Sequence, residues 1–375
     1  MDERALVEDE WRYVVSLLPP DFEERAFSKF AIQRRRRVTS GEELLRLVLA
    51  YSVCDFSLRQ LAAWARVTGL AELSDVAALK RLRGASAWLG DLVVAWLTER
   101  GLTRDVPPLS VRVIDASVVM APGGVGVDWR IHAGLDLATQ QLTSVEVTGP
   151  EGAETLARHT VAAGEVVLAD RGYAHREAVA AVLAAGAHVV VRGNWQNFPL
   201  ETRAGARLDL LACLETLSPG ELGDWSVAFR AGTTSYPLRV VAVRKSQAAT
   251  AREQRKIRYA AQRKRRQPDP RSLRAANFVY VLTDLPADVL PAREALELYR
   301  LRWQIELAFK RLKSILNLDR LRAHDPELAR TYLYGKLLAA LMLDELCSST
   351  VAFFPWGFPL VRHPAQSLAL AGLAD

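Results

Sequence analysis

Apolar and polar residues alternate at helical spacing through the first hundred positions of the chain. Apolar residues recur every three or four positions over 41–51 and again over 57–69, where Gly69 stands at the place of a helix stop. A third stretch, 74–84, predicts a short helix with a serine at its cap position. We therefore expect an all-α region over residues 1–106, and short helices with tight turns are compatible with a helix-turn-helix arrangement.

After two consecutive prolines, at 107 and 108, the pattern changes to short apolar runs rich in β-branched residues. The order β-β-β-α-β-α-β predicts an α/β fold, with a mixed sheet that helices cover. The predicted strands are 111–119, 129–137, 141–147, 165–170 and 188–192, and the predicted helices are 153–160 and 176–185.

Residues 194–286 are again strand-like but interrupted. Strands are predicted over 225–229, 236–244 and 278–283, and a basic segment, helical or disordered, separates the last two. A helix over 291–316 and an apolar helix near 333–347 follow.

Composition narrows the class of protein. The chain has 375 residues, enough for two or three domains, and its net charge of +6 favours a polyanionic partner. Three widely spaced cysteines form no zinc-site or disulfide pattern, which suggests a reduced, cytoplasmic protein. The acidic N-terminus does not resemble a signal peptide, and no apolar run is long enough to predict a membrane span.

The helix predicted over 291–316 carries the most informative motif. Tyr299, Arg302, Glu306 and Lys313 lie at offsets of 0, 3, 7 and 14. On one continuous helix these offsets fall within an arc of roughly 60°, so the four side chains would share one face. A carboxylate among a tyrosine and two cations suits a site that meets both a metal ion and a phosphate chain. The alternative is an exposed helix on which Glu306 forms ordinary salt bridges.

Two aspartates interrupt or end apolar strands, where an unpaired carboxylate is costly. Asp115 lies inside the run 111–119, and Asp170 ends the run 165–170. Asp170 is also a candidate turn or cap residue, and Asp115 a candidate buried, hydrogen-bonded aspartate. Together with Glu306 they make three carboxylates, which suffice for a site with two Mg²⁺ ions about 3.5–4 Å apart.

These motifs resemble the bacterial insertion-sequence transposases of the acidic-triad (DDE) superfamily, in the family marked by the signature Y-x2-R-x3-E-x6-K. Tyr299, Arg302, Glu306 and Lys313 match that signature at every spacing. The likeness extends to Ile-Asp-Ala-Ser around Asp115 and to Ala-Asp-Arg-Gly-Tyr around Asp170. It also includes the helical stretches at 57–64 and 76–82, and so covers most of the chain.

The resemblance implies an RNase H-like mixed sheet with flanking helices, a β-rich insertion and an all-α N-terminal DNA-binding domain. Asp115, Asp170 and Glu306 would be the catalytic residues and the ligands of two Mg²⁺ ions, with Mn²⁺ as a substitute. Tyr299, Arg302 and Lys313 would hold phosphates of the transposon end. The expected domains are 1–106 (DNA binding), 107–193 (first part of the core), 194–286 (insertion), 287–350 (second part of the core) and 351–375 (tail).

Other residues are candidate DNA contacts. Lys310 lies on the signature helix, and Trp303 would either stack on an unpaired base or pack in the core. The run from 252 to 266 carries many basic residues and few acids, so we expect it to follow phosphates rather than to be a solvated helix face. The candidate DNA contacts in this run are its last four residues: Arg263, Lys264, Arg265 and Arg266.

The expected function is cut-and-paste transposition by phosphoryl transfer, with hairpin formation at the element's ends. Expected partners are double-stranded DNA, which includes the terminal inverted repeats and the target, and a second copy of the chain in a synaptic dimer. The expected location is the bacterial cytoplasm, at the nucleoid. Two alternatives stay open: a domesticated DNA-binding protein that no longer cuts, and a metal-dependent nuclease on the same fold.

Overall fold

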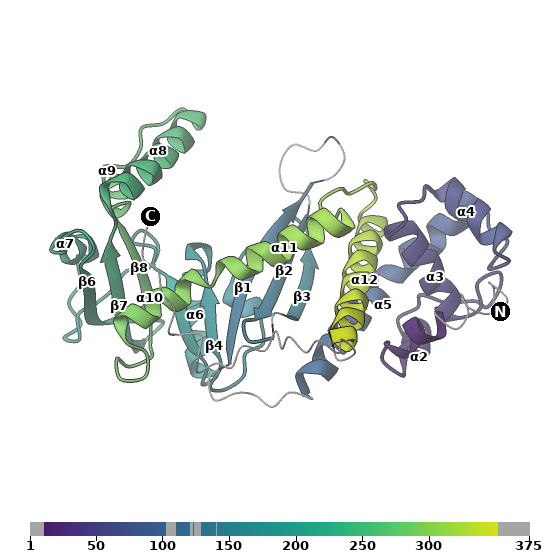
Figure 1. Cartoon of the computed structure of the whole chain (residues 1–375), viewed down its shortest axis with the longest axis horizontal. Coiled ribbons are helices and arrows are strands. Elements are labelled where there is room, and N and C mark those ends of the chain that lie inside the picture. The colour runs from purple at the N-terminus through teal and green to yellow at the C-terminus, as the bar shows by residue number, and fades with distance from the viewer. Residues whose placement is uncertain (1–10, 103–109, 121–122, 124–128, 140, 352–375) are drawn as a thin grey trace.

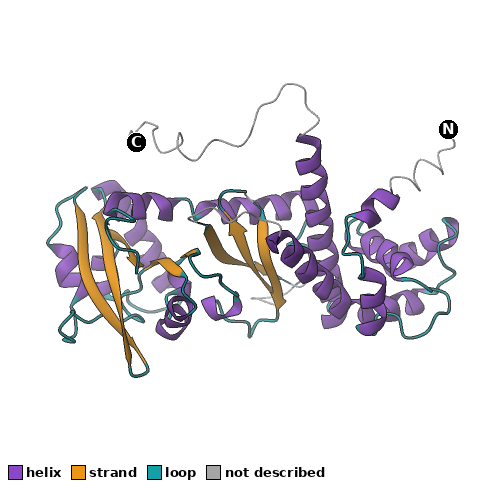
Figure 2. Cartoon of the chain, turned by 90° about the horizontal axis from the view of Figure 1, so that it is seen from below, coloured by secondary structure: helices purple, strands orange, loops and turns teal. Residues whose placement is uncertain are grey.

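The computed structural model describes residues 11–102, 110–120, 123, 129–139 and 141–351. The molecule is elongated, with the N-terminal helices at one end, the sheet in the middle and a long hairpin at the other end (Figures 1 and 2). The described helices are α2 (Phe22–Ser28), α3 (Gly41–Ser52), α4 (Leu58–Val67), α5 (Asp75–Leu102), α6 (Arg176–Ala184), α7 (Leu210–Glu215), α8 (Gln247–Arg263), α9 (Pro270–Ala275), α10 (Ala292–Arg300), α11 (Trp303–Leu316) and α12 (Pro326–Val351).

Side-chain caps start the N-terminal helices. The Ser40 hydroxyl accepts a hydrogen bond from the Glu43 N–H at the start of α3. Ser57 and Gln60 form a capping box at the start of α4, and Gly69 follows that helix with a φ of 72°. In the described part of the chain, only helices and loops precede the first strand.

The prediction of a short helix over 74–84 is wrong about the length of that helix. It is the start of α5, which continues through Gly84 to Leu102. The residues after Gly84 keep the helical apolar spacing, and Trp88, Leu89 and Leu92 are fully buried. Their burial outweighs the cost of one glycine inside a helix, about 1 kcal/mol.

All eight described strands form one sheet in the order β3-β2-β1-β4-β5-β8-β7-β6. The β1–β4 and β4–β5 pairs are parallel and the others are antiparallel. The insertion therefore extends this sheet, because β8 pairs with β5, and it also contains α7, α8 and α9. The strands are β1 (Val111–Val119), β2 (Trp129–Asp136), β3 (Leu142–Thr148), β4 (Val166–Ala169), β5 (His188–Arg192), β6 (Leu222–Ala231), β7 (Thr234–Arg244) and β8 (Phe278–Thr283).

The helix predicted over 153–160 is absent from the structure, and only a 3₁₀ turn, Leu156–Arg158, forms there. The segment lacks the apolar face that holds a helix against a core, since Leu156 is its one buried hydrophobic residue. Thr155 caps the turn, and the Arg158 side chain donates to the Ala153 carbonyl, so local side chains close the loop.

Apolar layers cover both faces of the sheet. Val113, Leu168 and Val190 belong to one cluster, which they share with α5, α10, α11 and α12. Ile114 and Val167, one position along their strands, belong to the other cluster with α6 and α7. Successive strand residues point to opposite faces, so burial on both faces explains the continuous apolar runs in the sequence. No described helix is long and apolar enough to cross a membrane.

A buried lysine joins the end of α11 to the N-terminal helices. Lys336 on α12 is 1% exposed, and its Nζ donates to the carbonyls of Leu316 and Asn317, where α11 ends. The same Nζ lies 3.5 Å from the carboxylate of Asp55, which is in the turn between α3 and α4. The Tyr332 hydroxyl donates to Asp55 as well. This cluster therefore ties three separate elements together.

Replacing Lys336 by alanine is expected to lower the free energy of unfolding by about 2–3 kcal/mol, because it leaves the carbonyls of Leu316 and Asn317 without this donor and Asp55 without its cation. Urea unfolding measures this change. Lys336→Met retains most of the side-chain volume and is expected to lose less. Equal stability of Lys336→Ala and wild type would contradict this role.

A buried histidine makes stability depend on pH. His159 is 8% exposed, and burial, together with the positive charges of Arg112 and Arg158 and with nearby His132, lowers its pKa to about 3. The unfolded chain binds a proton at His159 below about pH 6.5, whereas the folded chain does not. Stability is therefore expected to fall as pH decreases, by about 2 kcal/mol at pH 5 from this group.

Urea unfolding of wild type and of His159→Gln between pH 7 and pH 5 tests this expectation. The variant should lose less stability over that interval. The matched control is His175→Gln, at an exposed position, which should follow the wild type. Identical pH slopes for His159→Gln and wild type would contradict the assignment.

Candidate active site

The two strand aspartates lie side by side where the parallel pairing of β1 with β4 stops. The last paired residues of β1 and β4 are Ile114 and Ala169, and the next residues on the two strands are Asp115 and Asp170. The register thus brings together two carboxylates that are 55 positions apart in the chain, as the numbering shows. Polar groups at the carboxyl ends of parallel strands are a common arrangement for a functional site in α/β sheets.

The signature residues meet these aspartates from a break between two helices. The Tyr299 hydroxyl donates to Asp170 Oδ1 at 3.0 Å. Arg302 donates through Nη1 to Asp115 Oδ2 at 3.2 Å and through Nη2 to Glu306 Oε1. The Arg302 guanidinium therefore lies between the strand carboxylate and the helix carboxylate. α11 crosses in front of β1 and β2, which places this cluster over the sheet (Figure 1).

The prediction of one continuous helix face is wrong. α10 ends at Arg300 and α11 begins at Trp303, and the Leu301 and Arg302 N–H groups bond three residues back, to Leu298 and Tyr299. Side chains three residues apart eclipse one another in such a 3₁₀ turn. This tighter turn aligns Tyr299 with Arg302, and their side chains reach Asp170 and Asp115.

Burial and neighbouring charges shift the pKa values of the two aspartates in opposite directions. Burial raises the pKa of Asp115 to about 6, and the negative charges of Asp170 and Glu306 add to that effect. Burial also acts to raise the pKa of Asp170. There, the Arg171 backbone N–H, Arg302 and Tyr299 outweigh burial, and the pKa lies below its ordinary value. Because these carboxylates are partly desolvated and repel one another, a positive charge placed among them stabilises their charged forms.

Two strand carboxylates and the Glu306 carboxylate around one guanidinium form a donor set that fits a hard cation. Carboxylate oxygens are the ligands that Mg²⁺ prefers. Arg302 now supplies the positive charge among them, and burial alone would lower its pKa. Glu306, Tyr299, Asp170 and Asp115 outweigh burial and raise that pKa. Among the described residues, no three His, Cys, Asp or Glu side chains lie close enough together to hold a metal, which agrees with Glu306 being bonded to Arg302.

The other predicted residues of α11 differ in their exposure to solvent, and the two lysines among them are not paired with the three carboxylates in the described structure. Trp303 is 48% exposed, so the alternative of a packed core tryptophan is wrong. Lys310 is exposed and Lys313 is half-buried, one and two turns beyond Glu306. Neither lysine forms an ion pair with Asp115, Asp170 or Glu306 in the described structure. The structure thus brings together Tyr299, Arg302 and Glu306 but leaves Lys313 apart from the carboxylates.

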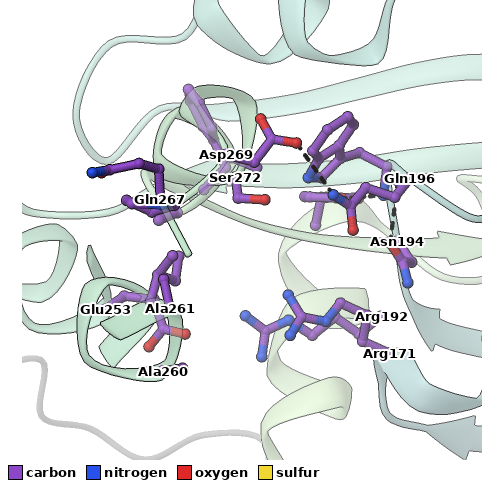
Figure 3. Close-up of a pocket in the computed structure, with 18 of the residues that line it drawn as sticks. Arg171, Arg192, Asn194, Gln196, Glu253, Ala260, Ala261, Gln267, Asp269 and Ser272 are labelled. Carbon is purple, nitrogen blue, oxygen red and sulfur yellow. Dashed lines mark hydrogen bonds between the residues drawn. The ribbon is translucent and has the colours of Figure 1, made fainter. Parts of the chain in front are cut away.

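A cavity of about 470 Å³, the basic cavity, is lined by three arginines and two acidic residues, and one of the arginines directly follows Asp170 in the chain (Figure 3). Arg171, which directly follows Asp170, and Arg192, at the end of β5, line one side of it. Of the four basic residues predicted at the end of α8, Arg266 lines the cavity. Arg263, Lys264 and Arg265 are exposed beside it.

Burial lowers the pKa of nearby Lys245, and the charges of Arg192, Lys256 and Arg171 add to the decrease, whereas Glu253 opposes it. Sequence reasoning missed Arg171 and Arg192. A signal was available, because Arg171 belongs to the Ala-Asp-Arg-Gly-Tyr motif and Arg192 ends a buried strand. A concentration of cations beside two carboxylates suits a phosphodiester substrate.

Comparisons with known proteins agree with this chemistry. A family model described as the transposase DDE domain matches residues 107–342. The putative transposase InsL for insertion sequence element IS186A, from Escherichia coli (strain K12), is 38% identical over 357 residues, covering 92% of this chain and 96% of the relative. The transposase for IS421 from Escherichia coli is 37% identical, with the same coverage. The transposase for IS231E, from Bacillus thuringiensis subsp. finitimus, is 24% identical and covers 89% of this chain and 78% of its own length.

Proposed function

Because this chain belongs to the insertion-sequence transposases with a DDE domain, we propose that Asp115, Asp170 and Glu306 are the residues with which it cuts and joins DNA. One observation carries this proposal. Arg302 lies between Asp115 and Glu306, and Tyr299 from the same turn bonds Asp170. Signature residues and strand aspartates that are far apart in sequence thus contact one another, which supports a shared site.

The three carboxylates would hold Mg²⁺ or Mn²⁺, two ions per site, which would stabilise the attacking and leaving oxygens of a phosphodiester. Arg302 and Tyr299 would orient the end phosphates, and Lys313 would contact phosphate further along α11. Arg171, Arg192 and Arg266 would hold the strand beside the aspartates. Cations placed where charge develops lower the barrier for phosphoryl transfer.

The reaction would be a series of in-line transfers at this one site. Water would attack the phosphodiester at the element's end and release a 3′-hydroxyl. That hydroxyl would attack the opposite strand and form a hairpin, a second water would open the hairpin, and the 3′-hydroxyl would attack target DNA. Each step exchanges one phosphate–oxygen bond for another, so the same carboxylates serve all of them.

Cut-and-paste transposition needs two ends held together, so we expect a dimer on DNA with one site per copy. The helices α3, α4 and α5, with the basic run 34–37 ahead of them, would bind the terminal inverted repeats. Exposed Trp303 would stack on an unpaired base beside the cut, since aromatic rings bind displaced bases in this way.

The test uses duplexes that carry the element's own ends, labelled on each strand, with Mg²⁺ or Mn²⁺. Denaturing gels separate the nick, the hairpin and the product joined to a second duplex. The wild type is expected to form all three, and Glu306→Gln none. Glu297→Gln, the same change at an exposed position of α10, is the matched control and should behave as wild type.

Other outcomes would assign a different activity. Nicks without hairpin or joined product would indicate a simple metal-dependent nuclease. Tight binding of the ends without cleavage by the wild type would indicate the non-catalytic DNA-binding protein.

A further inference from the structure

Helix α8 has two faces of different chemistry. It is 17 residues long, only Ala261 on it is buried, and more than half of its residues are exposed. With about 100° between successive residues, five exposed residues fall within an arc of roughly 100°. We call these residues the outer stripe: Arg252, Arg255, Lys256, Tyr259 and Arg263.

The opposite face of α8 belongs to the active-site side of the molecule. Glu253, Ile257 and Ala261 line the basic cavity, across from Arg171 and Arg192 (Figure 3). The outer stripe lies roughly opposite these residues on the helix, so it faces away from the cavity. α8 also projects with α9 beyond the end of the sheet, where a large partner can reach it (Figure 1).

The outer stripe has the chemistry of a nucleic-acid surface. It holds four cations, and in the described structure only Lys256 has an acidic partner, Glu253 at 3.6 Å. Tyr259 is 63% exposed in the middle of these cations, although an unpartnered tyrosine would ordinarily pack against protein. Helical rise makes the stripe about 16 Å long, which spans several phosphates of one duplex. Arginine, lysine and tyrosine in this arrangement bind backbone phosphates without reading base sequence.

We propose that the outer stripe binds the duplex that receives the element, along an arm beside the attacked phosphate, while the cavity face serves the duplex that is cut. This inference rests on the proposed function. The two faces are separated by the thickness of a helix, about 10 Å, so one stretch of duplex does not contact both. Target DNA has no fixed sequence, which matches a surface that recognises phosphates alone.

The test removes three charges from the outer stripe with Arg252→Gln, Arg255→Gln and Lys256→Gln together. The matched control removes three exposed arginines outside α8, with Arg203→Gln, Arg207→Gln and Arg293→Gln together. For each protein we would measure end cleavage, joining to a duplex of unrelated sequence, and the affinity for that duplex at several salt concentrations.

Joining by the stripe variant is expected to fall about tenfold more than its end cleavage does. The slope of log affinity against log salt should become shallower by about 3, because three phosphate contacts are lost. The control variant should show neither change. Equal losses of cleavage and joining would overturn the proposal, since the stripe would then hold the cut duplex, and so would an unchanged joining yield.

The role of the outer stripe can be tested even if the proposed function fails. If the wild type does not cleave its ends, the proposed function fails, and the affinity measurement alone decides the role of the stripe. A salt slope equal to that of wild type in the stripe variant would then overturn the inference, and a slope shallower by about 3 would support it.

Discussion

Replacing Asp115 by asparagine is expected to lower metal-dependent cleavage of element ends by a factor on the order of a thousand or more. Asp115 is the half-buried carboxylate between Arg302 and the Asp170 strand end, and an amide keeps its shape but loses the charge that a divalent cation needs. The measurement is the single-turnover rate of nicking at saturating protein, with Mg²⁺ and then with Mn²⁺.

The same substitution is expected to leave the fold and end binding intact. Burial raises the pKa of Asp115, so its charge is costly to the folded state and the neutral amide relieves that cost. Thermal unfolding and the dissociation constant for the ends in the absence of metal serve as controls. Nicking within tenfold of wild type, by a folded variant that binds its ends, would contradict a catalytic role for Asp115.

Replacing Arg302 by glutamine is expected to change two quantities in opposite directions. In the DNA-free protein, Arg302 bonds Asp115 and Glu306 and so competes with a metal ion for the same oxygens. Its removal should tighten Mn²⁺ binding about tenfold, a change of about 1.4 kcal/mol. End cleavage should nevertheless fall on the order of a hundredfold, because a cation that orients the phosphate is lost.

Titration calorimetry with Mn²⁺ and the nicking rate together test this expectation. Arg300→Gln removes the same charge from an exposed position two residues away and should change neither quantity. Mn²⁺ binding by Arg302→Gln that is equal to or weaker than in wild type would show that Arg302 does not compete with the metal.

Local patterns predicted much of the fold. The strands around Asp115 and Asp170 follow from uninterrupted apolar runs, because the sheet is covered on both faces. The reach of α5 past Gly84 did not follow, since it depends on the burial of Trp88 and its neighbours against other helices. The loop at 153–160 was mistaken for a helix, although it has no apolar face.

The candidate site was also predicted only in part from the sequence. Spacing alone grouped Tyr299, Arg302 and Glu306, and the structure brings them together through a 3₁₀ turn rather than along one helix. The bond from Arg302 to Asp115 joins residues 187 positions apart and depends on how α11 crosses the sheet. Arg171 and Arg192 were missed although each carried a local signal, because their common cavity exists only when the strand ends meet α8 and α9.

The most direct measurement of the central claim substitutes a metal ligand and then changes the metal. Asp170→Cys replaces a hard oxygen ligand by a thiolate, which binds Mg²⁺ poorly and Mn²⁺ or Cd²⁺ better. If Asp170, Asp115 and Glu306 hold the ions that cut DNA, the variant should nick element ends with Mn²⁺ or Cd²⁺ but not with Mg²⁺. Nicking with Mg²⁺ at the wild-type rate would show that Asp170 is not a ligand and would contradict the account.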